Sequence, residues 1–216
     1  MRLLAITLLC CVICACNKPV PEYRAVYVLI DRSGIYSDSF DNISKTLKLL
    51  LATLSSGDSL ALARIDNEIF SHANVMATLT LSSRPSYANN QKRALYYAVD
   101  KMATEKYVGS YTDVTGGMLE AAAWLNATRA GKKIIIVFSD FPEEPRTGYM
   151  NEFPVNYNGA SVLVWNVLEP PAPGDIDLAE SHSFVDRAAV WQQRVTEGGG
   201  QWIIIHDVAK LAQVIQ

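Results

Sequence analysis

Cysteine is absent from nearly the whole of this 216-residue chain, because its four cysteines stand at positions 10, 11, 14 and 16 and none follows. A disulfide framework spread across the fold is therefore excluded. Charge is also scarce: 19% of the residues are charged and the formal net charge is -3, which argues against an electrostatic nucleic-acid binder. Half of the residues are hydrophobic, which excludes a disordered chain, and the length fits one compact domain.

The amino-terminal residues have the pattern of an export signal. Arg2 precedes the apolar run Leu3–Ala15, which is shorter than the roughly 18 apolar residues that predict a membrane-spanning helix. One positive charge before a short apolar stretch is typical of a secretory signal peptide. The end of the run, Ile13-Cys14-Ala15-Cys16, resembles the bacterial lipobox. That resemblance implies cleavage after Ala15 and a Cys16 that carries diacylglycerol and an N-acyl chain; an ordinary cysteine-rich signal peptide is the alternative.

These features divide the chain into three parts. We expect a lipoprotein signal peptide over residues 1–15, a lipidated cysteine and short tether over 16–22, and one domain over 23–216. Acyl chains, rather than attraction to anionic lipid headgroups, would hold the protein on the extracytoplasmic side of a bacterial membrane. Asn17 follows the cysteine where an aspartate would favour inner-membrane retention, so we expect the outer membrane.

Short apolar runs rich in β-branched residues recur along the domain. Most do not alternate with polar residues, which is typical of parallel strands buried on both faces. These runs are Ala25–Ile30, Leu60–Ile65, Ile134–Phe138, Val162–Val167 and Trp202–Ile205. Val75–Leu81 alternates more and suits an edge strand.

Helical spacing appears between these runs. Phe40, Ile43, Leu47, Leu50 and Leu54 form one apolar stripe. Further helices are expected over Asn90–Thr104, Gly117–Thr128, Phe184–Glu197 and Val208–Val214, with Gly198–Gly200 as a flexible stop and Asp207 as a cap. The alternation of strands and helices predicts an α/β fold. We expect a doubly wound, mostly parallel sheet with one antiparallel edge strand and helices on both faces.

Polar residues follow the expected strands at their carboxyl ends, where open parallel sheets bind ligands. Asp31-Arg32-Ser33-Gly34 follows the first strand and Ser139-Asp140 the fourth, and a loop rich in hydroxyl groups, Gly109–Gly117, precedes a helix. Carboxylate and hydroxyl oxygens suit a hard cation such as Mg²⁺.

These motifs, in this order, resemble the von Willebrand factor type A (vWA) domain and its metal-ion-dependent adhesion site. The resemblance implies that Mg²⁺ or Mn²⁺ is bound by a set of four residues: Asp31, Ser33, Thr112 and Asp140. The chain departs from the family at Ile35, where the second serine of the loop would stand and where no side-chain oxygen is present. A water, or Ser37 after a rearrangement of the loop, would have to fill that place. The alternative is that Asp31 and Asp140 accept N–H bonds from loops and helix ends and bind no metal.

The resemblance implies protein binding rather than catalysis, with an acidic side chain of a protein partner completing the coordination of the cation. Aromatic, arginine and acidic residues near the site are candidates for the partner surface. These are Arg32, Tyr36, Tyr111, Glu143 and Glu144. Two alternatives stay open: a metal-dependent or phosphate-handling hydrolase that uses Asp31 and Asp140, and a vWA scaffold that has lost metal binding.

Overall fold

The structure is a computed structural model of the chain. It describes residues 22–31, 40–65, 74–104, 113–141, 154–165 and 178–215. The domain predicted over 23–216 lies largely within these ranges, whereas the predicted signal peptide and Cys16 lie outside them.

The described residues form a six-stranded sheet in the order β3-β2-β1-β4-β5-β6. The strands are β1 Arg24–Asp31, β2 Ser59–Ile65, β3 Val75–Thr80, β4 Lys132–Phe138, β5 Ser161–Trp165 and β6 Gln201–Ile205. Neighbouring strands pair in parallel, except that β3 runs antiparallel to β2 at one edge. The predicted mostly parallel sheet with one antiparallel edge strand is confirmed.

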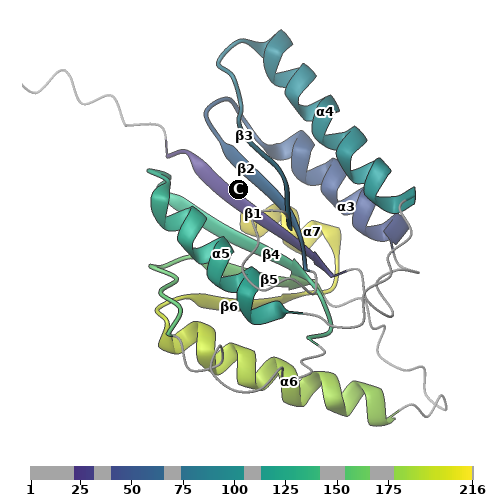
Figure 1. Cartoon of the computed structure of the whole chain (residues 1–216), viewed down its shortest axis with the longest axis vertical. Helices are drawn as coiled ribbons and strands as arrows, with labels where there is room; N and C mark the ends of the chain where they lie inside the picture. The colour runs from purple at the N-terminus through teal and green to yellow at the C-terminus, as the bar shows by residue number, and fades with distance from the viewer. Residues whose placement is uncertain are drawn as a thin grey trace, which may run out of the picture.

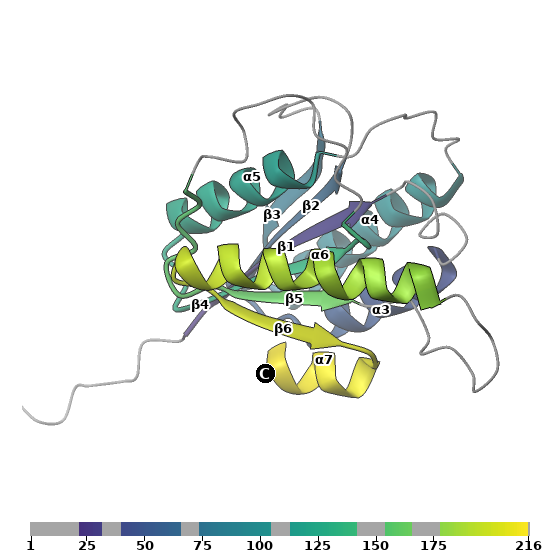
Figure 2. The same cartoon turned by 90° about the horizontal axis from the view of Figure 1, so that it is seen from below.

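Helices cover both faces of this sheet, as predicted (Figure 1). They are α3 Phe40–Thr53, α4 Pro85–Thr104, α5 Val114–Ala127, α6 Leu178–Glu197 and α7 Val208–Ile215. In the view of Figure 2, α5 and α6 lie on one face, while α3, α4 and α7 lie on the other.

Strand β1 supplies both halves of the core, because successive side chains of a strand point to opposite faces. Val26, Val28 and Ile30 belong to the apolar cluster beneath α3, α4 and α7. Ala25, Tyr27 and Leu29 belong to the cluster beneath α5 and α6. All six are fully buried, which explains why the strand shows no polar alternation in the sequence.

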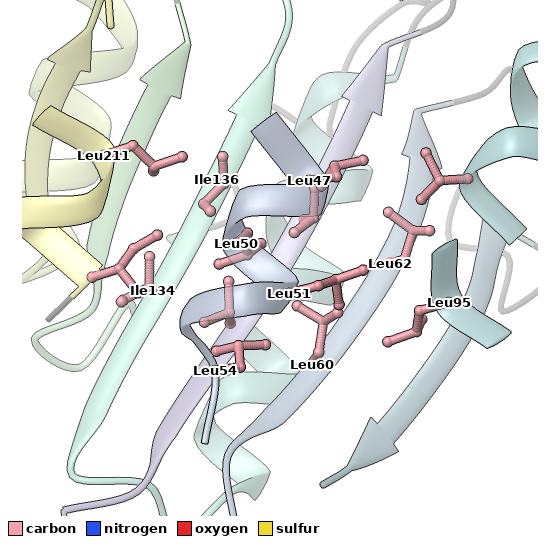
Figure 3. Close-up of a cluster of buried hydrophobic side chains, with 14 of the residues drawn as sticks. Leu47, Leu50, Leu51, Leu54, Leu60, Leu62, Leu95, Ile134, Ile136 and Leu211 are labelled. Carbon is pink, nitrogen blue, oxygen red and sulfur yellow. The ribbon is translucent and has the colours of Figure 1, made fainter. Parts of the chain in front are cut away.

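Helix α3 packs on the sheet through the stripe that its spacing predicts. The buried side chains of the helix include Ile43, Leu47 and Leu50, and the buried Leu54 directly follows its end. Figure 3 shows these leucines between the labelled side chains of β4 and those of β2. Each fully buried leucine or isoleucine contributes about 1.5–3 kcal/mol by the removal of apolar surface from water. The burial of these apolar side chains therefore holds the helix on the sheet.

Several helices begin earlier than the sequence pattern indicates. Helix α4 begins at Pro85 rather than Asn90, because proline fits the first turn of a helix, where its missing N–H has no intrahelical partner. Helix α5 begins at Val114 rather than Gly117, since Asp113 caps it and places two glycines in the first turns. Apolar periodicity alone does not detect such polar or glycine-containing first turns.

The glycine run after α6 is a packed turn rather than the flexible stop we expected. Gly199 has a φ of 75°, and a Cβ atom at Gly198 would lie 2.1 Å from the carbonyl oxygen of Val155. The carbonyl of Gly198 also accepts a hydrogen bond from the N–H of Tyr157 at 2.9 Å. Close backbone approach and a positive φ, rather than flexibility, therefore explain these glycines.

A partly buried ion pair between Arg24 and Asp58 closes the amino end of the sheet. Arg24 donates from its backbone N–H to Asp58 Oδ1 and from Nε to Asp58 Oδ2, each at 2.9 Å. The same guanidinium donates to the carbonyls of Thr53 and Ile215. This network joins β1, the end of α3 and the end of α7, and it leaves the carboxyl edge of the sheet as the other pole of the domain.

Candidate functional site

The carboxyl ends of β1 and β4 meet at the centre of the sheet. The register pairs Ile30 with Phe138, so the next residues, Asp31 and Ser139, face one another across the two strands. The strand order runs outward from β1 to β3 on one side and from β4 to β6 on the other. The β1–β4 junction is therefore the topological switch point, where doubly wound folds bind their ligands.

Asp31 and Ser139 form a buried hydrogen-bonded pair. Asp31 is 1% exposed and Ser139 is fully buried. The hydroxyl of Ser139 donates to Asp31 Oδ2 at 2.7 Å, and Ser139 Oγ accepts the N–H of Phe141 at 2.9 Å. The hydrogen bond from Ser139 therefore helps to orient the side chain of Asp31 at the end of β1.

Asp140 is the second carboxylate at this edge, and its side chain is 19% exposed. Burial raises its pKa above the ordinary carboxyl value, while a backbone hydrogen bond and the charge of Arg187 act in the opposite direction. Arg187 of α6 donates from Nε to the carbonyl oxygen of Asp140 at 2.8 Å. Its Nη2 lies 3.5 Å from Asp140 Oδ2. The arginine therefore holds the backbone closely and the carboxylate loosely.

The residue after Asp140 anchors the loop in the core. Phe141 is fully buried with a φ of 58°, a region that bulky side chains rarely adopt. Its ring lies 5.6 Å from the ring of Trp191 on α6 and 5.7 Å from that of Trp202 on β6, measured between centroids. A strained backbone of this kind costs about 1–3 kcal/mol and persists because the surrounding packing holds it.

The first turn of α5 packs beside the end of β1. Asp113 caps the helix by accepting the N–H of Gly116 at 2.8 Å. A Cβ atom at Gly117 would lie 3.2 Å from Leu29 and 3.7 Å from Ile65, so the glycine allows close contact with β1 and β2. The helix therefore begins against the same edge of the sheet as Asp31, in the segment that follows Thr112 in the sequence.

Two of the four predicted metal ligands, Asp31 and Asp140, lie within the described residues: Asp31 ends β1, and Asp140 follows the end of the neighbouring strand β4 by two residues. The other two, Ser33 and Thr112, lie outside them, and so does Ile35. The predicted partner residues also lie outside them, namely Arg32, Tyr36, Tyr111, Glu143 and Glu144. The metal site and the partner surface therefore stay predictions.

The sequence places Ser139 among the polar residues at this edge, because it stands directly between a buried apolar strand and Asp140, but it does not indicate that Ser139 bonds to Asp31. Arg187 was not identified at all. Arg187 carries no such signal, since it lies 47 positions after Asp140 in a helix with several other charged residues.

The oxygens at this edge fit a hard cation in type. The described ranges contain no group of three or more His, Cys, Asp or Glu side chains that could hold a metal ion. Magnesium uses few carboxylates and keeps several waters, so a complete carboxylate cage is not required. Asp31 and Asp140 therefore supply suitable anionic oxygens, to which the hydroxyls of Ser33 and Thr112 would be added.

Solved structures of low sequence identity share this fold. An aerotolerance-related membrane protein from Bacteroides fragilis matches with a TM-score of 0.53 at 14% identity, over 88% of this chain and 96% of that one. A von Willebrand factor type A protein from Catenulispora acidiphila matches with a TM-score of 0.51 at 13% identity, over 90% of this chain and 41% of that one. BatB from Bacteroides thetaiotaomicron gives a TM-score of 0.50 at 11% identity, over 88% and 94%.

No protein-family model matches the sequence, and no curated protein does either. The structural matches nevertheless confirm the predicted resemblance at the level of the fold, because the chain has the architecture of a vWA-type domain. None of the helices in the described ranges combines the length and hydropathy of a membrane span.

Proposed function

We propose that this chain is a lipid-anchored, extracytoplasmic vWA-type module that binds a protein partner through Mg²⁺ or Mn²⁺. One observation carries the proposal: Asp31 and Asp140 lie at neighbouring strand ends, at the switch point of a vWA-type sheet. Binding rather than catalysis is the activity that this arrangement supports best.

In this proposal the side chains that hold the cation are those of Asp31, Ser33, Thr112 and Asp140. A water fills the coordination place that Ile35, which has no side-chain oxygen, leaves without a ligand. The bound cation supplies an open coordination position for an acidic side chain of the partner. Ser139 keeps Asp31 oriented through its 2.7 Å hydrogen bond. Arg32, Tyr36, Tyr111, Glu143 and Glu144 would surround the site and select the partner.

The proposed anchor is Cys16, with its diacylglycerol and N-acyl chains, after removal of residues 1–15. The matched Bacteroides fragilis protein is described as a membrane protein, which supports a location at the cell envelope. We propose the outer membrane as the location because Asn17, and not an aspartate, follows the cysteine.

A vWA scaffold without metal is the second candidate, and a specific observation favours it. Ser139 donates a hydrogen bond to Asp31, and Arg187 contacts Asp140. Both carboxylates thus have polar partners from the chain itself. This candidate keeps the fold and a protein-binding surface but predicts no response to Mg²⁺ or Mn²⁺.

Calorimetric titration of the full chain, purified in detergent, with Mg²⁺ and Mn²⁺ tests the proposal. We expect the wild type to bind Mn²⁺ and Asp31→Asn, which keeps the shape but removes the charge, to bind it at least about tenfold more weakly. Asp100→Asn, at an exposed position on α4, is the matched control and should bind like the wild type. Thermal melting shows whether each variant is folded.

A folded wild type that binds neither cation would replace the proposal by the scaffold. Turnover of a phosphate ester such as p-nitrophenyl phosphate, lost in Asp31→Asn, would replace it by the hydrolase alternative.

A further inference from the structure

Helix α6 contacts two consecutive residues that follow β4, Asp140 and Phe141. Arg187 bonds the carbonyl of Asp140 at 2.8 Å, and the ring of Trp191 packs on Phe141. Arg187 and Trp191 are four positions apart and therefore lie on the same face of the helix, one turn from each other. Phe184, Ala188 and Val195 bury α6 against the sheet, so the helix holds Arg187 on a rigid base.

The two bonds of Arg187 differ in strength. The bond from Nε to the Asp140 carbonyl has ordinary length, whereas Nη2 stands 3.5 Å from the carboxylate, at the long limit of a hydrogen bond. The side chain of Arg187 is 32% exposed. Its guanidinium can keep the bond to the Asp140 carbonyl while the Asp140 carboxylate turns to another cation. The guanidinium group carries one positive charge.

We propose that Arg187 is a resident cation of the site, which competes with the divalent ion for Asp140 and thereby sets how tightly that ion binds. The inference rests on the proposed function and names a regulation of the same site. Arg187 is a positioning residue here, since it acts on the cation through Asp140.

Charge balance gives the competition a second consequence. Asp31, Asp140 and Arg187 together carry one excess negative charge, which a divalent cation converts to one excess positive charge. That positive charge attracts an anionic group of a partner. Without Arg187 the cation would neutralise the two aspartates, so the site would hold the metal more tightly and an acidic partner less tightly.

Mn²⁺ titration of the full chain in detergent tests the inference, with wild type, Arg187→Gln, Arg187→Lys and Arg93→Gln compared at two salt concentrations. The repulsion between a divalent and a monovalent cation at about 6 Å in water corresponds to about a tenfold change in affinity. We therefore expect Arg187→Gln to bind Mn²⁺ about tenfold more tightly than the wild type. The gain should shrink at high salt, because screening weakens the repulsion.

The other variants separate charge from shape. Arg187→Lys keeps the charge and should bind Mn²⁺ nearly as weakly as the wild type, which a purely structural role would not produce. Arg93 is an exposed arginine of α4 that donates hydrogen bonds to Asn89 and Asn90 of its own helix, so Arg93→Gln controls for the loss of one positive charge. It should leave the affinity unchanged.

The outcomes distinguish the two proposals. Equal or weaker Mn²⁺ binding by folded Arg187→Gln, while the wild type binds, overturns the role of Arg187 and leaves the metal site standing. Binding by Arg187→Gln alone, abolished by adding Asp31→Asn, supports the competition in its extreme form. No binding by either protein, with normal melting, overturns the metal site itself and the competition with it.

If Arg187→Gln does not fold, Arg187→Lys is compared with the wild type instead. The role of charge is supported if the two proteins bind Mn²⁺ with similar affinity and if both affinities weaken alike with salt. Tighter binding by Arg187→Lys overturns it.

Discussion

Ser139 bonds to Asp31 and Arg187 contacts Asp140, although each aspartate is far from its partner in the sequence. Asp31 and Ser139 are 108 positions apart, and Asp140 and Arg187 are 47 apart. The aspartates could be predicted, since each stands at the end of a buried apolar strand or just after it. Their contacts with Ser139 and Arg187 could not, because these arise only when β1 meets β4 and when α6 folds across the same end of the sheet.

Tyr27 is a residue whose polar atom the fold leaves unpaired. Its hydroxyl is buried and has no hydrogen-bond partner among the described residues, while its ring packs edge-on against Trp124 at 5.6 Å. Burial, with a smaller contribution from the charge of Glu120, raises the pKa of the Tyr27 hydroxyl well above its usual range. The Tyr27 side chain therefore stabilises the fold through the packing of its ring rather than through its hydroxyl.

We predict that Tyr27→Phe stabilises the domain by about 1 kcal/mol at pH 7, because an unpaired buried polar group is removed. The gain should grow above pH 10. There the unfolded tyrosine loses its proton while the folded one keeps it, so the folded state binds more protons and wild-type stability falls as pH rises. The expected slope is about 1.4 kcal/mol per pH unit.

Urea unfolding between pH 7 and pH 11 measures this difference. Tyr97→Phe, at a tyrosine of α4 that is 67% exposed, is the control and should leave the pH profile unchanged. If Tyr27→Phe followed the wild type at every pH, the Tyr27 hydroxyl would have to reach water or a partner in the folded state.

At the scale of elements, helix starts were the features that the sequence pattern predicted least well. Apolar spacing finds the buried face of α5 through Met118, Ala122 and Leu125, but it misses the first turn. That turn depends on Asp113 as a cap and on Gly116 and Gly117. In the sequence, two adjacent glycines indicate a loop rather than the start of a helix. Physically, contact with β1 and the cap hydrogen bond outweigh the poor helix propensity of glycine.

We predict that Asp113→Ala and Gly116→Ala are strongly non-additive. A Cβ atom at Gly116 would lie 2.2 Å from Asp113 Oδ2, so alanine there breaks the cap, which is worth about 1 kcal/mol. With Asp113→Ala already present, the same alanine should instead stabilise α5 by up to about 1 kcal/mol through its helix propensity.

A four-member cycle of urea unfolding free energies measures the coupling, which should be about 1 kcal/mol. Asp113→Ala with Gly117→Ala is the matched cycle, since a Cβ atom at Gly117 would contact Leu29 and Ile65 rather than the cap. Additive energies in the Gly116 cycle would show that the cap does not depend on the glycine.

For the whole molecule, the sequence predicted the layered architecture but not the order of the strands. Strand runs and helices in alternation indicate a doubly wound sheet, whereas the adjacency of β1 and β4 depends on contacts between segments about 100 residues apart. That adjacency brings Asp31 and Asp140 to one edge. It also separates the site from the pole where residues 22–24 enter the sheet, as the strand directions in Figure 1 show.

The separation of the two poles predicts how the anchored protein faces its membrane. The chain enters β1 at Arg24 and reaches Asp31 seven residues later, or about 23 Å at about 3.3 Å per residue. Residues 17–22 span at most about 20 Å at about 3.5 Å per residue. If Cys16 holds the lipid, the entry pole must stay near the bilayer and the site should face away from it.

Spin labels placed on the lipidated protein in vesicles test this orientation. Residues 17–216 contain no cysteine, so single labels can be attached at Arg129→Cys near the entry pole and at Val185→Cys near the site. Both positions are exposed, and Val185 precedes Arg187 on α6 by two residues. We expect membrane-dissolved oxygen to relax the label at 129 more strongly than the label at 185. The reverse order would mean that the site faces the lipid, where a protein partner could not reach it freely.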